Sequence, residues 1–202
     1  MVTSADRRVF FVGDSFVAGV GDPEHRGWVG RLAARSDAEG VPITAYNLGV
    51  RRDTSDDVRR RWPDEVAVRR AAGSEERMVL SFGVNDTATD DDLPRVAPDR
   101  SVANLRAVVD GAASVGLPLL VVGPAPVGDP AQSRRIAALD DRFHAACVEA
   151  AVPYVAVYTA LATESMWADE VGRGDGSHPG AKGYALLAEL VLPAWRRWLG
   201  ME

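Results

Sequence analysis

Two short segments near opposite ends of the sequence contain the residue types that nucleophilic catalysis needs. Ser15 follows the apolar run 9–12, and Asp175 and His178 lie three positions apart just before the last helical stretch. A serine hydroxyl becomes a good nucleophile when an imidazole accepts its proton and a carboxylate orients that imidazole. These residues predict a serine hydrolase in which Ser15 is the nucleophile, His178 the base and Asp175 its orienting partner.

Acyl transfer also needs hydrogen-bond donors for the oxyanion of the tetrahedral intermediate. The predicted donors are the backbone N–H groups of Ser15 and Gly49 and the side-chain amide of Asn85. Glycine permits a close backbone approach, and a carboxamide is a neutral donor that does not compete for the proton of the base. Asp14, beside the nucleophile, is expected to bond backbone N–H groups and shape the loop.

Five apolar runs bounded by turn residues predict buried strands, and they alternate with five amphipathic stretches of helical period. We expect strands at 9–12, 43–48, 78–82, 117–122 and 154–157, and helices near 27–39, 54–72, 99–115, 133–151 and 180–199. This alternation predicts right-handed βαβ units and a parallel sheet covered by helices on both faces. Loops at the carboxyl ends of parallel strands share one edge, so the four segments with candidate site residues should meet there.

Four sequence blocks, in this order, resemble those of the SGNH hydrolase superfamily, also called the GDSL lipase/esterase family. The blocks are 13–19, 47–49, 83–86 and 175–179, with Phe16 and Val17 in place of the usual Leu-Ser. The resemblance implies a flavodoxin-like, three-layer α/β/α fold with a central parallel five-stranded sheet. It also implies the triad and oxyanion donors named above, and no cofactor.

Composition narrows the classes of function. The chain has 202 residues, 47% of them hydrophobic, and no linker-like segment, which predicts one domain over 1–202. A net charge of −6 disfavours nucleic acids and anionic membrane surfaces as partners. The arginine run 59–61 has acidic neighbours on both sides and is predicted to lie on a solvated helix face.

The polar start of the chain, residues 1–8, and the lack of a membrane-length apolar segment predict a cytoplasmic protein without integral membrane association. Cys147 recurs with apolar residues at helical spacing, which predicts a buried structural thiol. His25 and His144 lack metal-ligand spacing, so no metal site is predicted.

The predicted substrate is a small-molecule carboxylic ester with a short acyl or acetyl group. Three alternatives stay open: a thioesterase, a lysophospholipase of the same fold, and a non-catalytic binding domain that retains the motif. The loops 124–132 and 158–174 are expected to wall the acyl and alcohol pockets, with Val127 and Trp167 as apolar substrate-binding residues.

Arg52 stands where many relatives have another glycine, in a loop expected to border the nucleophile. It is expected either to pair with a loop acid such as Asp53 or Asp56, or to reach over the pocket mouth and favour anionic esters. Trp195 and Trp198 are predicted to pack the last helix on the sheet, and an exposed subset could serve a homodimer.

Overall fold

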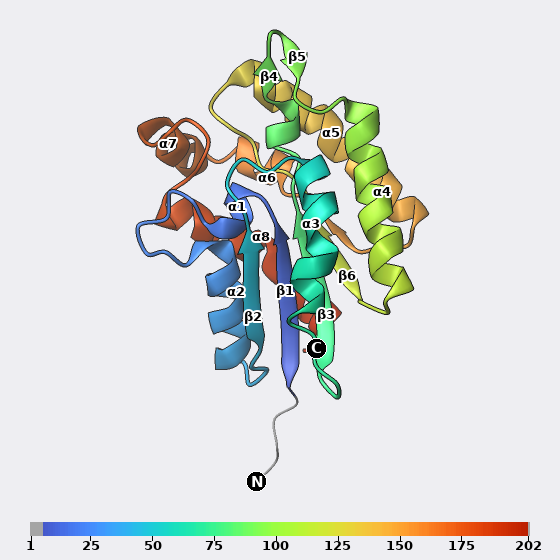
Figure 1. Ribbon diagram of the computed structural model, residues 1–202. Coiled ribbons are helices and arrows are strands. Elements are labelled where there is room, and N and C mark those ends of the chain that lie inside the picture. The colour runs from blue at the N-terminus through green and yellow to red at the C-terminus, as the bar shows by residue number, and fades with distance from the viewer. Residues whose placement is uncertain (1–5, 202) are drawn as a thin grey trace.

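A computed structural model of the chain describes residues 6–201 and has a central five-stranded parallel sheet (Figure 1). The strands are β1 (Arg7–Gly13), β2 (Thr44–Gly49), β3 (Glu75–Ser81), β6 (Leu119–Val122) and β7 (Tyr154–Val155), in the order β2-β1-β3-β6-β7. This is the strand order of flavodoxin-like folds. The predicted fold class is confirmed. Residues 1–5 of the polar N-terminal segment lie outside the described residues.

Helices cover both faces of the sheet, which makes three layers. On one face lie α2 (Gly27–Ala38) and α8 (Ala181–Leu199), and on the other α3 (Ser55–Ala67), α4 (Pro98–Ser114) and α5 (Pro130–Glu149). All five correspond to predicted helices. The shorter elements were not predicted: α1 (Ser15–Ala18), the 3-10 helix η1 (Asn85–Thr87), the hairpin β4 (Thr89–Asp90) and β5 (Leu93–Pro94), α6 (Tyr158–Ala162) and α7 (Ser165–Arg173).

Strand β1 lies in the interior of the sheet, and its apolar run 9–12 is fully buried. Successive side chains of a strand point to opposite faces, so a strand covered on both sides is apolar at every position. Phe10 belongs to the core cluster under α3 and α4, whereas Phe11 belongs to the cluster under α2 and α8. There the Phe11 ring meets Trp28 edge-on at 5.8 Å and stacks on Trp195 at 5.6 Å.

The other predicted packing residues also have defined surroundings. Trp195 is buried and donates from Nε1 to Ser36 Oγ at 2.7 Å, while Trp198 is partly buried with the Arg77 guanidinium 5.3 Å from its ring. Cys147 is buried in the core, and burial raises the pKa of its thiol to about 12. Among residues 6–201, no helix combines the length and apolar character needed to cross a membrane. The homodimer stays a prediction.

Gly13 ends β1 at the point where the backbone turns toward Ser15. A Cβ atom at this position would lie 1.9 Å from the carbonyl oxygen of Ser81 and 2.6 Å from Cγ2 of Val17. The first of these neighbours is backbone of the adjacent strand β3, which cannot move without disturbing the sheet. Only glycine therefore fits at the end of β1, just before Ser15.

The Gly13→Ala substitution should lower the free energy of unfolding by about 1–3 kcal/mol, the usual cost of overpacking a core. Gly172→Ala is the matched control, because a Cβ at this α7 position meets no atom within 4 Å. The control should be neutral or stabilising by up to about 1 kcal/mol, since alanine favours helix over glycine. Urea unfolding of both variants measures the difference, and equal stabilities would contradict the close approach.

Candidate active site

The turn between β1 and α1 presents Ser15. Asp14 is the N-cap of α1, and its Oδ1 accepts a hydrogen bond from the backbone N–H of Phe16 at 3.0 Å. Ser15 is the first residue of the helix and is buried. At this position the backbone N–H has no acceptor within the helix. The cap thus holds Ser15 at a helix N-terminus on the carboxyl edge of the sheet.

The segment between α7 and α8 brings His178 to Ser15 (the elements are labelled in Figure 1). Nε2 of His178 lies 2.7 Å from Oγ of Ser15, and its Nδ1 lies 2.7 Å from Oδ2 of Asp175. If Nδ1 carries the proton and donates to Asp175, Nε2 is left as the acceptor for the serine hydroxyl. The structure therefore brings the three predicted residues together in one hydrogen-bonded chain.

Asp175 is held as an anion by its own loop. Its Oδ1 accepts the backbone N–H groups of Ser177 at 3.0 Å and His178 at 2.9 Å. Burial alone would raise the pKa of Asp175, but these hydrogen bonds and the one from the His178 ring outweigh it and lower the pKa to about 2. A carboxylate of this kind stabilises the imidazolium that forms when His178 accepts a proton.

Contacts from α8 and α7 lock the histidine segment against the serine loop. The hydroxyl of Tyr184 in α8 donates to the carbonyl of Val20 at 2.7 Å, five residues after Ser15. Glu170 in α7 accepts the backbone N–H of Gly183 at 2.7 Å and so caps the start of α8. These bonds set the short distance between two residues that are far apart in the sequence.

Two predicted oxyanion donors already have acceptors. The Gly49 N–H donates to Oδ1 of Asn47 at 3.0 Å, and Nδ2 of Asn85 donates to the carbonyl of Asp53 at 2.9 Å. A carboxamide has two N–H donors, so one of those on Asn85 is left for a ligand. Gly49 also packs on α1, because a Cβ there would lie 2.2 Å from the backbone nitrogen of Ala18.

Arg61 connects the end of β1 with the loop after β2, a role that the sequence did not indicate. It donates from Nη2 to the carbonyl of Gly13 at 2.7 Å and from Nε to Asp53 at 2.6 Å. The prediction that the whole run 59–61 lies on a solvated face is wrong for Arg61, whose side chain is only 17% exposed, whereas that of Arg60 is 74% exposed. The helical spacing of the run could have shown that these neighbours cannot share one face.

The two predicted apolar substrate residues lie in the core. Val127 and Trp167 are buried, and Trp167 donates from Nε1 to the carbonyl of Pro126 at 3.1 Å. The Trp167 ring stacks on Phe16 at 6.4 Å, and the Phe16 ring lies 5.0 Å from that of His178. Trp167 therefore supports the residue packed on His178, and neither Val127 nor Trp167 lines the cavity described next.

A cavity of about 560 Å³ opens beside His178. Its walls come from the loop after α1, the loop after β2 and the segment from the end of α7 to the start of α8. The lining residues are Val20, Gly21, Pro23, Arg51, Glu170, Arg173, Gly174, Asp175, His178, Pro179 and Gly180.

Arg51 lines this cavity, and Arg52 does not. Arg52 has a left-handed backbone with φ 71°, and its carbonyl accepts a hydrogen bond from Arg95 at 3.1 Å. Asp53 and Asp56, the acids considered as its partners, pair with Arg61 and Arg100. Among the residues that the structure describes, no group of three or more His, Cys, Asp or Glu side chains could hold a metal ion.

Comparisons with known proteins identify the family and the fold. A sequence model of the GDSL-like lipase/acylhydrolase family matches residues 11–186. The uncharacterized protein YpmR of Bacillus subtilis is 34% identical over 77 residues, a match that spans 37% of this chain and only 30% of YpmR.

Solved structures of similar fold match almost the full chain. A lipase/acylhydrolase from Enterococcus faecalis is 24% identical, with a TM-score of 0.74 and coverage of 95% of this chain and 96% of that one. Axe2, an acetylxylan esterase from Geobacillus stearothermophilus, is 21% identical, with a TM-score of 0.76 and coverage of 100% and 98%. At these identities the likeness shows the fold.

Asp14 is a fully buried carboxyl group directly beside Ser15. Burial raises its pKa to about 7, although the hydrogen bond from Phe16 acts in the opposite direction. Its second oxygen, Oδ2, has no hydrogen-bond partner within residues 6–201. The carboxyl group is therefore protonated in the folded protein at pH values where it is ionised in the unfolded chain.

This difference predicts how stability depends on pH. Between the ordinary pKa of 3.8 and the raised value of about 7, the folded state binds a proton at Asp14 that the unfolded state does not. The contribution of Asp14 therefore falls as pH rises, by up to about 1.4 kcal/mol per pH unit. The Asp14→Asn variant lacks this contribution, so its stability relative to the wild type should improve from pH 4 to pH 7. Urea unfolding across this range measures it, and a constant difference would refute the assignment.

Proposed function

We propose that this chain, which belongs to the GDSL-like lipase/acylhydrolase family, is a serine carboxylic ester hydrolase with Ser15, His178 and Asp175 as its triad. As predicted, it is an ester-hydrolysing enzyme. The observation that carries the proposal is the pair of 2.7 Å hydrogen bonds from Ser15 through His178 to Asp175. A buried serine that only capped a helix would need neither the imidazole nor the carboxylate.

The first half of the reaction forms an acyl-enzyme. Nε2 of His178 accepts the proton of Ser15 as Oγ attacks the ester carbonyl, and Asp175 stabilises the imidazolium. When the tetrahedral intermediate collapses, His178 passes that proton to the leaving alcohol. Water then attacks the acyl-enzyme with His178 again as base, which releases the acid and restores Ser15.

The negative charge on the intermediate needs donors near Ser15. We assign this role to the N–H of Ser15, the free N–H of the Asn85 amide and the N–H of Gly49. The Gly49 N–H would have to be shared with, or released by, Asn47 Oδ1, which accepts it at 3.0 Å. Asn85 is held toward the site by its bond to the Asp53 carbonyl, which in turn belongs to the loop anchored by Arg61.

We propose short acyl or acetyl esters as substrates. Axe2, which shares the fold, is an acetylxylan esterase, and this makes acetyl esters the first compounds to test. The buried Phe16 ring lies 5.0 Å from that of His178, and the buried Trp167 stacks on Phe16, which argues against a deep acyl channel on this side. Thioesters, lysophospholipids and binding without turnover are the other outcomes of the tests below.

Ser15→Ala and His178→Ala should each reduce kcat/KM for p-nitrophenyl acetate by at least about a thousandfold. The double variant should be little worse than either single one, because the two residues act as one unit. A fluorophosphonate probe should label the wild type and not Ser15→Ala, since only an activated hydroxyl reacts.

Ser114→Ala is the matched control for these measurements. Ser114 ends α4, where its hydroxyl bonds the Gly111 carbonyl, and it should keep wild-type activity and labelling. Additive losses in the double variant would contradict the base–nucleophile pair. A wild-type protein that is folded but neither labelled nor active would favour the binding-domain alternative.

Asn85→Ala should lower kcat by about a hundredfold to a thousandfold and change KM far less. The amide donor acts mainly on the charge that develops in the transition state, and losses of this size follow removal of one oxyanion donor. Steady-state kinetics on p-nitrophenyl acetate separate the two parameters. A change confined to KM would move Asn85 from the oxyanion hole to ground-state substrate binding.

A further inference from the structure

We propose that the cavity beside His178 binds the alcohol part of the ester and selects alcohols that carry a carboxylate, which Arg51 and Arg173 bind. The inference rests on the proposed ester hydrolase function and deepens it, because it names the class of substrate. It also moves the expected anion contact from Arg52 to two other arginines.

The position of the cavity indicates which half of the substrate it takes. His178 and Asp175 line it, whereas the three proposed oxyanion donors Ser15, Gly49 and Asn85 do not. His178 is the residue that protonates the leaving alcohol, so the alcohol must lie on the histidine side of the scissile bond. A cavity of about 560 Å³ on this side has room for an alcohol of moderate size.

The acidic side chains of the cavity, Glu170 and Asp175, already accept hydrogen bonds from the protein itself. Glu170 accepts the backbone N–H of Gly183 at 2.7 Å and that of Lys182 at 3.4 Å, at the start of α8. Asp175 is bonded to the His178 ring and to two backbone N–H groups. Both carboxylates therefore already accept hydrogen bonds from protein donors. Glu170 also faces the positive N-terminal end of α8.

Within residues 6–201, the two arginines of the cavity have only weak partners. Arg51 makes a single 3.3 Å contact with Oδ2 of Asp175, and its side chain is 60% exposed. Arg173 lies 3.4 Å from the exposed Asp169, and its own side chain is 78% exposed. Exposed ion pairs of this kind contribute little stability. Both guanidinium groups can therefore turn to a ligand carboxylate, for which their planar forks are well suited.

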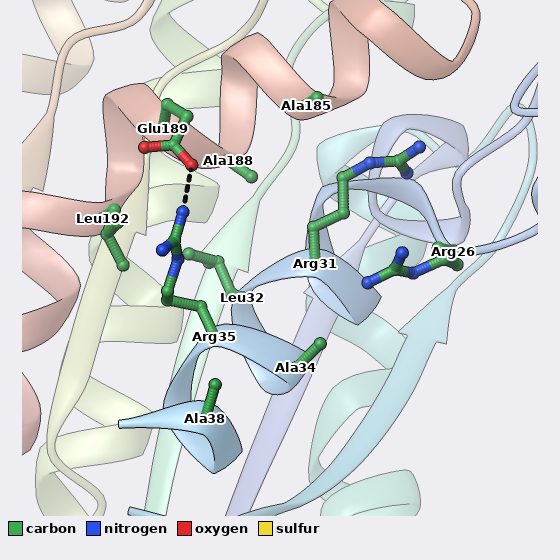
Figure 2. A pocket seen from close by; sticks show the side chains of 10 residues that line it. All are labelled: Arg26, Arg31, Leu32, Ala34, Arg35, Ala38, Ala185, Ala188, Glu189 and Leu192. Carbon is green, nitrogen blue, oxygen red and sulfur yellow. Dashed lines mark hydrogen bonds and ion pairs between the residues drawn. The ribbon is translucent and has the colours of Figure 1, made fainter. Parts of the chain in front are cut away.

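A second hollow in the molecule is also lined by arginines. It lies between α2 and α8 and has a volume of about 350 Å³. Figure 2 shows the three arginines that line it, Arg26, Arg31 and Arg35. Arg35 pairs with Glu189 at 2.9 Å, as Figure 2 shows. Arg31 pairs with the fully buried carboxylate of Asp22, and Arg26 lies 3.8 Å from Glu24. This hollow contains no residue of the proposed triad, whereas Arg51 and Arg173 line the cavity that His178 also lines.

Removal of Arg51 also removes a contact to Asp175, so the loss of activity on one substrate would not by itself identify a binding role. The test therefore compares two acetyl esters with the same aromatic alcohol part, 4-acetoxybenzoate, which carries a carboxylate, and its uncharged methyl ester. A disturbed Asp175 would slow both. The intrinsic reactivity of each ester is the same for every variant, so the ratio of their kcat/KM values isolates the carboxylate contact.

Arg51→Ala and Arg173→Ala should each lower kcat/KM for 4-acetoxybenzoate about threefold to tenfold more than for the methyl ester, and the double variant about tenfold or more. Arg52→Ala is the matched control and should keep the wild-type ratio. Added salt should reduce the wild-type preference, because exposed charges are screened. Equal losses on both esters, or a ratio that falls with Arg52→Ala and not with Arg51→Ala, would overturn the proposal.

A binding measurement separates this proposal from the proposed function. Calorimetric titration of both esters into Ser15→Ala protein, with and without Arg51→Ala and Arg173→Ala, reports the carboxylate contact without turnover. A preference for 4-acetoxybenzoate that disappears with the arginines supports the site even if the wild type proves inactive. Equal affinity for both esters in Ser15→Ala protein would overturn it even if Ser15-dependent hydrolysis is found.

Discussion

The organisation of this protein depends on a 2.7 Å contact between Oγ of Ser15 and Nε2 of His178, two side chains that are 163 positions apart in the sequence. A hydrogen bond weakens steeply with distance and angle, so both backbones must be held to within a few tenths of an ångström. On the serine side this is done by a buried strand that ends in Gly13 and by the Asp14 cap. On the histidine side it is done by the bond from Tyr184 to the serine loop.

A partly buried ion pair close to Ser15 is the second feature that the site has to accommodate. Arg61 connects the carbonyl of Gly13 with Asp53, and the carbonyl of Asp53 accepts the Asn85 amide. One guanidinium thus touches both the strand that presents Ser15 and the loop that orients a proposed oxyanion donor. Asp14 lies next to this network, where burial favours its neutral form.

The site has two sides of different character. Behind His178 the rings of Phe16 and Trp167 stack in the core, which leaves that side packed. On the other side the loops after α1 and β2 and the end of α7 leave an open cavity with two weakly paired arginines. Packing of this kind restricts the imidazole, while the open side leaves space for a substrate whose chemistry the arginines select.

Sequence alone determined the fold class and the identity of the residues that meet. Continuous apolar strands such as 9–12 alternate with amphipathic helices, and this periodicity is local, so it predicted the parallel sheet and the shared carboxyl edge of Ser15, Gly49, Asn85 and His178. The short elements around the site have no such period. Four residues suffice for α1, and its formation depends on the Asp14 cap and on the contact of Gly49 with its backbone.

Only the tertiary structure decided which side chains face the cavity. Arg51 and Arg52 are adjacent and chemically identical, and the choice between them depends on a left-handed backbone at Arg52 that no residue type dictates. Trp167 and Val127 have the right character for an apolar pocket, but the same character also favours burial, and the core contacts of Trp167 determined its place. Residue types and their spacing specify what chemistry can occur, whereas packing between distant segments determines which neighbouring side chain can take part in it.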